Sequence, residues 1–128
     1  MIEILAGGPL ATVQDLGRPG YAHLGVSPSG ALDPAASRLA NRLVGNPEGS
    51  ATIEVTLGGL VFRPGVSAWL AVTGAAVPLS VAGRPQAMNC PVYLAMGAEV
   101  RLGLPTAGVR SYVALTGGIE VAPTLASR

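Results

Sequence analysis

The chain has 128 residues, enough to bury one ordinary core, so a single domain is expected. Apolar residues make up 49 % of the sequence and charged residues only 12 %, which predicts that a partner covers part of the surface. The net charge of +1, without a basic run, gives no electrostatic basis for nucleic-acid binding.

The N-terminus and the uncharged stretches bear on location. Residues 1–4 lack the basic region and apolar segment of a secretion signal, so a cytoplasmic protein is expected. Residues 64–83 are uncharged, but their prolines and glycines would break a spanning helix, and we interpret them as two core strands and a turn. The single cysteine, Cys90, excludes an internal disulfide and fits a reducing compartment.

Short apolar runs separated by glycine and proline predict a mainly β chain, with the strand spacing of a barrel or sandwich. In the clearest run, Thr52 to Leu57, alternate residues are apolar. Ile53, Val55 and Leu57 should therefore face one way, opposite to Thr52, Glu54 and Thr56. Further strands are expected at 2–5, 68–73, 77–81, 91–96, 99–102 and 110–116.

One helix is expected at about 34–44. Asp33 suits the N-cap and Pro34 the first turn, while Gly45 and Asn46-Pro47 should end the helix. Its apolar stripe is predicted to be Ala36, Leu39, Ala40 and Leu43, with Arg38, Asn41 and Arg42 lying off it.

The strongest candidates for a binding site are Gln14, Asp15 and Arg18, in a turn shaped by glycines and a proline. An amide, a carboxylate and a guanidinium so close together can bind a planar amide or carboxylate, because the guanidinium grips two oxygens at once. A second interpretation stays open, in which Asp15 and Arg18 pair with each other and fix the loop.

The loop from Gly25 to Asp33 precedes the predicted helix. Its backbone N–H groups and the helix N-terminus could receive an anion or a developing oxyanion. Ser27 and Ser29 would add hydroxyl donors, and Ser29 and Gly30 are the substrate-binding candidates here. The alternative is an ordinary capped helix start, in which Asp33 already occupies the N-terminus.

Three polar residues beside apolar ones, Asn41, Asn46 and Glu54, need hydrogen-bond partners if they are buried. A partly desolvated Glu54 could serve as a general base. The alternative is a solvated carboxylate paired with Arg42 or Arg63.

Several other chemistries have little support. One His and one Cys cannot build a typical structural zinc site, so no metal is expected. Neither a Walker loop nor a dinucleotide fingerprint occurs, so this chain shows no ATP pocket. Core or interface positions without chemistry are expected for Trp69, Met88, Cys90, Met96 and Tyr112.

The stretch from Thr12 to Glu54 closely resembles one protein family, known as KipA, allophanate hydrolase subunit 2 and the 5-oxoprolinase C subunit. The same module occurs in the carboxyltransferase region of biotin-dependent urea carboxylase. The resemblance is carried, in order, by Gln14-Asp15-Leu16-Gly17-Arg18, the loop 25–33, Ala40-Asn41, Gly45-Asn46 and Glu54. Members of the family are commonly more than twice as long. A cyclophilin-like β-barrel at 1–118, with 119–128 starting a truncated second half, is therefore expected.

The resemblance implies the C subunit of a multi-subunit, ATP-dependent 5-oxoprolinase, which acts with a KipI-like protein, the B subunit, and with an A subunit. It implies substrate binding by Gln14, Arg18, Ser29 and Gly30, and proton handling by Asp15 or Glu54. Two other functions stay open. One is a KipA-type regulator that binds and antagonises a KipI-like kinase inhibitor, and the other is a carboxyltransferase part of a urea carboxylase system that uses biotin.

Overall fold

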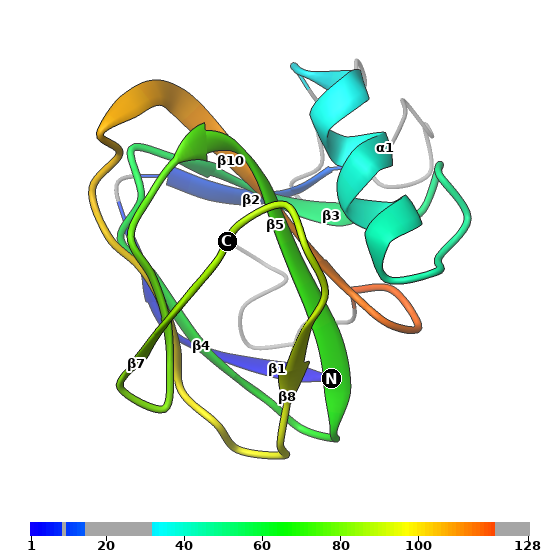
Figure 1. Cartoon of the computed structure of the whole chain (residues 1–128), viewed down its shortest axis with the longest axis vertical. Coiled ribbons are helices and arrows are strands. Elements are labelled where there is room, and N and C mark those ends of the chain that lie inside the picture. Colours follow the sequence, from blue (N-terminus) through cyan, green and yellow to red (C-terminus); the bar gives the residue numbers. More distant parts are fainter. Residues whose placement is uncertain (9, 15–31, 120–128) are drawn as a thin grey trace.

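The computed structural model describes residues 1–8, 10–14 and 32–119 of the chain, and these residues form two antiparallel β-sheets and one helix (Figure 1). The expectation of a mainly β chain with a helix is confirmed. The strands are β1 (Ile2–Gly7), β2 (Leu10–Gln14), β3 (Thr52–Thr56), β4 (Leu60–Pro64), β5 (Ala68–Ala76), β6 (Leu79–Val81), β7 (Arg84–Gln86), β8 (Val92–Leu94), β9 (Val100–Leu102) and β10 (Ala107–Leu115), and the helix is α1 (Pro34–Leu43).

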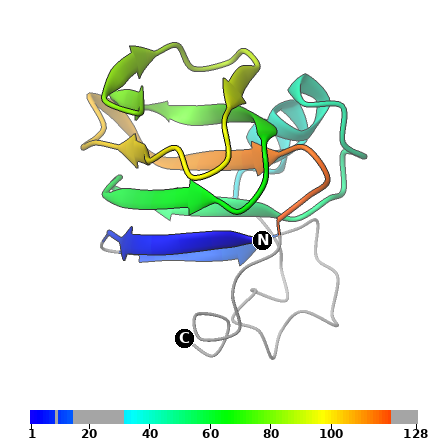
Figure 2. The ribbon, with the colours of Figure 1, turned by 90° about the horizontal axis from the view of Figure 1, so that it is seen from below.

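Each sheet has five strands. The order is β1-β4-β9-β6-β7 in one sheet and β2-β3-β10-β5-β8 in the other. Strand β1, drawn in blue in Figure 2, is an edge strand of the first sheet. In the second sheet β3 and β10 are interior strands, so their side chains are flanked by strands on both sides.

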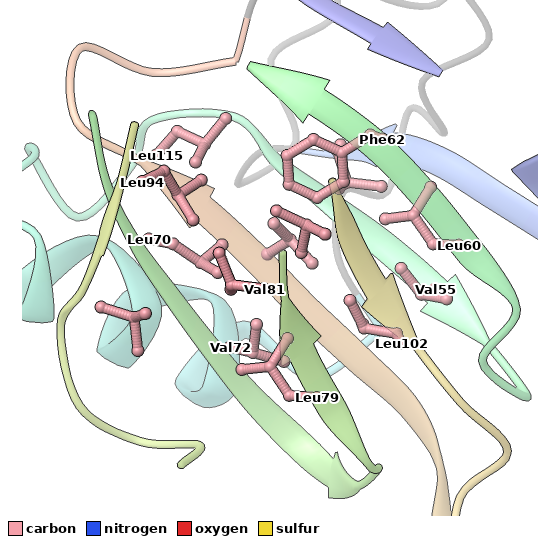
Figure 3. Packing of buried hydrophobic residues seen from close by; sticks show 14 of the residues in the cluster. Val55, Leu60, Phe62, Leu70, Val72, Leu79, Val81, Leu94, Leu102 and Leu115 are labelled. Atoms are coloured by element: carbon pink, nitrogen blue, oxygen red, sulfur yellow. The ribbon is translucent and has the colours of Figure 1, made fainter. Parts of the chain in front are cut away.

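The core lies between the two sheets, where apolar side chains from both inner faces meet (Figure 3). Leu70 and Val72 of β5 belong to the same buried cluster as Phe62 and Leu102 of the other sheet, and all four are at most 2 % exposed. Alternate residues of a strand point to opposite faces, so this core uses one face of each sheet. The outer face of the second sheet is left for α1.

Helix α1 packs on that outer face, against β10 and β5 (Figure 1). The sheet residues beneath it are small, Ala71 and Ala114, and Ala40 of the helix is fully buried against them. Small side chains let the helix approach the sheet closely without leaving a void. This contact fixes where the first turn of α1 lies over the sheet.

The ends of α1 agree with the sequence to within one residue. Asp33 is the N-cap, and its Oδ1 accepts a hydrogen bond of 3.1 Å from the Ala36 N–H. The helix ends at Leu43, one residue earlier than expected. Gly45 follows with a φ of 79°, a left-handed conformation that glycine adopts at little cost.

The buried face of α1 differs from the expected stripe. Ser37, Ala40 and Asn41 are buried, whereas Leu39 and Leu43 are not fully so. The position of Asn41 off the packed face was therefore wrong. The pattern of apolar residues does not reveal this face, because two of its three buried residues, Ser37 and Asn41, are polar and depend on specific partners.

Asn41, which is buried, and Asn46, which is half-buried, both have hydrogen-bond partners. The Asn41 amide donates to the carbonyls of Glu48, at 3.2 Å, and Ser50, at 2.8 Å. The Asn46 amide donates to the Leu115 carbonyl at 2.7 Å, and its oxygen accepts from the Gly117 N–H at 3.0 Å. Both residues tie the segment after α1 to its surroundings, so the expectation of hydrogen-bonded asparagines is confirmed.

Three strands were not predicted: β2, β4 and β7. In β7 every residue is exposed and the middle one is Pro85, so it carries no apolar alternation. In β2 only the last residue, Gln14, had been considered, as part of the candidate turn. Conversely, Val77 and Pro78 precede β6 rather than belong to it.

The predicted strand at 52–57 is confirmed except for its last residue. Leu57 has a φ of 60° and is 45 % exposed, so it lies in the turn. The turn is tight because Gly58 crosses the backbone of Gly103, where an added Cβ would lie 1.9 Å from the carbonyl oxygen. The close approach of Gly58 to Gly103 therefore sets the conformation of Leu57, and the alternation of β3 ends before this residue.

Of the five residues assigned to core or interface, two are too exposed for the core. Trp69 is 47 % exposed and Met96 69 %. The Trp69 ring makes an edge-on contact with Tyr93, also exposed, with ring centroids 5.5 Å apart. Tyr112 is fully buried, and Met88 and Cys90 pack partly buried against the core.

Within the described residues, no helix has the length and apolarity needed to cross a lipid bilayer.

Candidate functional site

A buried carboxylate lies on the outer face of the second sheet. Glu54 of β3 is only 6 % exposed. Tyr112 of β10 is its cross-strand partner, and the Tyr112 hydroxyl donates a hydrogen bond of 2.5 Å to Glu54 Oε2. A short bond from a phenol to a carboxylate is charge-assisted and stronger than a bond between neutral groups.

The solvated alternative for Glu54 is wrong. Arg42 binds Glu48 at 3.7 Å, and Arg63 binds Glu3 at 3.9 Å and Glu99 at 3.7 Å. These arginines have other partners, whereas the Glu54 carboxylate is held by a phenol.

The Glu54–Tyr112 pair also holds the backbone that leads into α1. The Leu32 N–H donates to Glu54 Oε2 at 3.0 Å, and the Asp33 N–H donates to Tyr112 Oη at 2.9 Å. Two interior strands of the sheet thus fix two consecutive peptide groups that are distant from them in sequence. Glu54 and Tyr112 act as a clamp on the helix start.

Burial raises the pKa of Tyr112 well above 10.0, because a phenolate would be poorly solvated there. The hydrogen bond to Glu54 acts in the same direction, since the neutral phenol is the donor. Tyr112 therefore stays protonated and remains a donor throughout the neutral range.

Two threonines of the sheet extend the clamp along the helix. Ser37 Oγ lies 3.0 Å from Thr52 Oγ1 of β3, and the Thr73 hydroxyl of β5 donates to the Ala36 carbonyl at 2.6 Å. Side chains of β3, β10 and β5 therefore all bond to residues 32–37. The first turn of α1 is held by polar contacts, in contrast to the alanines under its second half.

The helix start has few backbone donors left for a ligand. The N–H groups of Leu32, Asp33, Ala36 and Ser37 bond to Glu54, Tyr112, Asp33 Oδ1 and the Asp33 carbonyl, respectively. Pro34 has no N–H. Of the two interpretations of the loop before the helix, the capped helix start describes residues 32–37. The rest of that loop, including Ser27, Ser29 and Gly30, lies outside the described residues.

A pocket of about 560 Å³ opens beside the clamp. Residues 32–33 at the helix start, 74–76 of β5 and 107–110 of β10 line it. The register of β10 against β5 shifts here, so that Gly108, Val109 and Arg110 lie opposite Ala75 alone. Such a bulge bends a strand and often lies beside a functional site.

Two of the six predicted site residues, Gln14 and Glu54, lie in the part of the chain that the structure describes. Gln14 is the last residue of β2, and its backbone lies in register with Thr52. Asp15, Arg18, Ser29 and Gly30 lie outside the described residues. Of the predicted site residues, Glu54 is the one whose side chain the structure describes.

Tyr112 and Arg110 were missed as site residues. Both lie in a predicted strand, where Val113 and Leu115 supply the inward face. The alternation places 110 and 112 on the opposite face, which is the face that Glu54 shares. The strand pattern thus indicated that residues 110 and 112 share the outward face, but it did not reveal that β10 pairs with β3.

The two antiparallel sheets, the flanking helix and the buried carboxylate clamp define a mainly β domain with a candidate site on one outer face. A family model for the carboxyltransferase domain, subdomain A and B, matches residues 24–128. The chain belongs to this family.

The chain is similar to proteins of two kinds. The chain is 38 % identical over 127 residues to the 5-oxoprolinase C subunit of Escherichia coli, with 99 % of this chain and 41 % of the relative covered. It is 38 % identical over 127 residues to urea amidolyase of Lachancea kluyveri, covering 98 % of this chain and 7 % of the relative. The crystal structure of K. lactis urea amidolyase matches with a TM-score of 0.83 and 39 % identity, covering 99 % of this chain and 8 % of that chain. The chain thus spans about two fifths of one relative and a small part of the others.

Proposed function

We propose that the chain is part of a 5-oxoprolinase C subunit, which takes part in opening the lactam ring of 5-oxoproline to glutamate. The observation that carries this proposal is the 38 % identity, along 99 % of the chain, to the C subunit of the Escherichia coli protein. A second protein of the same name, from Haemophilus influenzae, is 33 % identical along 99 % of the chain.

Opening a lactam places negative charge on the amide oxygen, so the site needs donors for that oxygen and a group that moves a proton. In this proposal Gln14, Arg18, Ser29 and Gly30 bind the substrate, and Asp15 moves the proton. Glu54 contributes as well. Because its Oε2 already accepts bonds from Tyr112 and Leu32, we assign it mainly to positioning the backbone at the start of α1.

The proposal includes ATP and two partners, a KipI-like B subunit together with an A subunit, in the cytoplasm. Phosphate groups bind well at helix N-termini that have free N–H groups. The first turn of α1 offers few of these, because Asp33 caps it and Tyr112 and Glu54 take the N–H groups just before it. The start of α1 therefore does not suit a phosphate group, and we assign nucleotide binding to the partners.

A carboxyltransferase part of a urea carboxylase is the second candidate. The specific observation in its favour is the similarity to K. lactis urea amidolyase, with a TM-score of 0.83. In that case a biotin group on a partner would carry the carboxyl group. Its ureido ring is a small planar cyclic urea, and the pocket that Arg110 lines together with several glycines and alanines is compatible with such a ring.

The test is to co-express the full-length protein with the two proposed partners, the KipI-like protein and the A subunit, and to assay ATP-dependent formation of glutamate from 5-oxoproline. Turnover should require all three proteins and should be insensitive to avidin. Complexes that lack one of the three serve as controls. Stable assembly without turnover would contradict the proposal.

A further inference from the structure

The pocket beside the clamp is built by the chain itself. Gly74 and Gly108 both line it, with φ angles of 91° and 79° in the left-handed region that other residues seldom adopt. A Cβ on Gly74 would lie 2.5 Å from the Arg110 carbonyl oxygen. The Ser111 hydroxyl donates to the Ala75 carbonyl at 2.9 Å, which ties the end of the bulge to β5. Close backbone packing and this hydrogen bond therefore hold the bulge in shape.

Arg110 supplies the positive charge of this pocket. Pairing of β10 with β3 is unbroken from Arg110 to Val113, so Arg110 lies on the same face as Tyr112. Within the described part of the chain Arg110 makes no ion pair, unlike Arg42, Arg63 and Arg101, each of which binds a glutamate.

Asp33 supplies the negative charge. Its Oδ1 caps α1 through the Ala36 N–H, which leaves further acceptor capacity on the carboxylate. The other lining residues are Leu32, Val109, alanines and glycines, without charge. The described part of the wall thus combines one cation, one anion and small neutral residues, which suits a small ligand that carries both a carboxylate and an N–H donor.

We propose that this pocket is the subsite for a small cyclic amide acid, in which Arg110 binds the carboxylate and Asp33 accepts a hydrogen bond from the amide N–H. This inference rests on the proposed function, and it singles out 5-oxoproline over urea, because urea has N–H donors but no carboxylate. A guanidinium can bind both oxygens of a carboxylate at once, which makes the contact selective as well as strong.

The test compares binding of 5-oxoproline and of 2-pyrrolidinone, the same ring without the carboxylate, to the full-length protein with its partners, by titration calorimetry. Arg110→Gln should weaken 5-oxoproline binding about ten- to a hundredfold and leave 2-pyrrolidinone binding unchanged. Ala107→Leu, which fills the pocket without removing a charge, should weaken both ligands. The control is Arg84→Gln on β7 of the other sheet, which should change neither.

Binding and turnover separate this inference from the proposed function. Wild-type turnover with an unchanged KM in Arg110→Gln would overturn the subsite and leave the function standing. The expected weakening of 5-oxoproline binding by Arg110→Gln, in a complex that does not turn over 5-oxoproline, would support the subsite and contradict the function. Equal loss in Arg84→Gln, or no binding to wild type, would also overturn the subsite.

Discussion

Tyr112 Oη lies 2.5 Å from Glu54 Oε2, beneath the start of α1. Glu54 accepts a hydrogen bond from the N–H of residue 32, and Tyr112 accepts one from the N–H of residue 33. A buried carboxylate is costly unless it is hydrogen-bonded, so this arrangement keeps Glu54 stable inside the fold. It also makes the helix start depend on two interior strands. The clamp is the described feature that most directly connects the fold to the candidate site.

Replacing Tyr112 with Phe should lower the free energy of unfolding by about 1–3 kcal/mol, because the Asp33 N–H loses its acceptor and Glu54 loses a donor. Chemical denaturation of the full-length protein measures this. Tyr93→Phe, at an exposed tyrosine, is the matched control and should cost less than about 0.5 kcal/mol. Equal costs for the two variants would contradict the clamp.

The raised pKa of Tyr112 predicts a loss of stability at alkaline pH. In the unfolded chain tyrosine loses its proton near pH 10, whereas in the folded protein it keeps that proton to higher pH. Above pH 10 the unfolded state therefore binds fewer protons, and the stability from Tyr112, fully present below pH 10, falls as pH rises. The free energy of unfolding, measured between about pH 8 and about pH 11, should decline more steeply in wild type than in Tyr112→Phe. Parallel curves would exclude this role for Tyr112.

Asn46→Ala should destabilise the fold by about 1–3 kcal/mol, since the Leu115 carbonyl and the Gly117 N–H both lose their partner. Glu48→Gln tests a neighbouring surface contact, the 3.7 Å ion pair with Arg42. Because both side chains are about half exposed, this change should cost less than about 1 kcal/mol. Thermal unfolding of both variants gives the comparison, and a larger effect for Glu48→Gln would be inconsistent with the contacts described.

Alanine substitutions at two glycines with similar φ angles distinguish the cost of backbone strain from the cost of steric crowding. Gly58 (φ 67°) crosses the Gly103 backbone, whereas an added Cβ at Gly83 (φ 79°) meets nothing within 4 Å. Gly83→Ala should cost about 1 kcal/mol, from the left-handed conformation alone. Gly58→Ala should cost more, because the turn must move away from Gly103. Similar denaturation midpoints for the two variants would show that the crossing is looser than described.

Arg18→Ala tests the substrate-binding role proposed for the turn after β2. Loss of a charge-assisted bond should reduce kcat/KM about ten- to a hundredfold in the assembled complex. Arg84→Ala, on an exposed strand, is the control and should leave kcat/KM unchanged. Unchanged kcat/KM in Arg18→Ala would remove Arg18 from the site.

Local patterns predicted much of the fold. The alternation in β3 correctly placed Ile53 and Val55 inside and Glu54 on the other face, and Asp33 and Pro34 correctly marked the start of α1. Strand β7 could not be recognised, because all its residues are exposed and one is proline. The sheet order could not be predicted either, since it depends on pairings between distant strands.

The candidate site shows the same division. The polar residues Asn41 and Glu54 stood out among apolar neighbours, and both prove to be buried and hydrogen-bonded. Their partners, the Ser50 carbonyl and the Tyr112 hydroxyl, depend on the chain's path in space. Tyr112, 58 residues from Glu54 in sequence, was assigned to packing because nothing local connects the two.

The most direct test of the proposed 5-oxoprolinase function is a parallel assay of the reconstituted three-protein complex with 5-oxoproline and with urea, each with ATP and with or without avidin. Glutamate should form from 5-oxoproline, urea should not be consumed, and avidin should have no effect. Avidin-sensitive carboxylation of urea, without turnover of 5-oxoproline, would contradict the proposed function and establish the carboxyltransferase alternative.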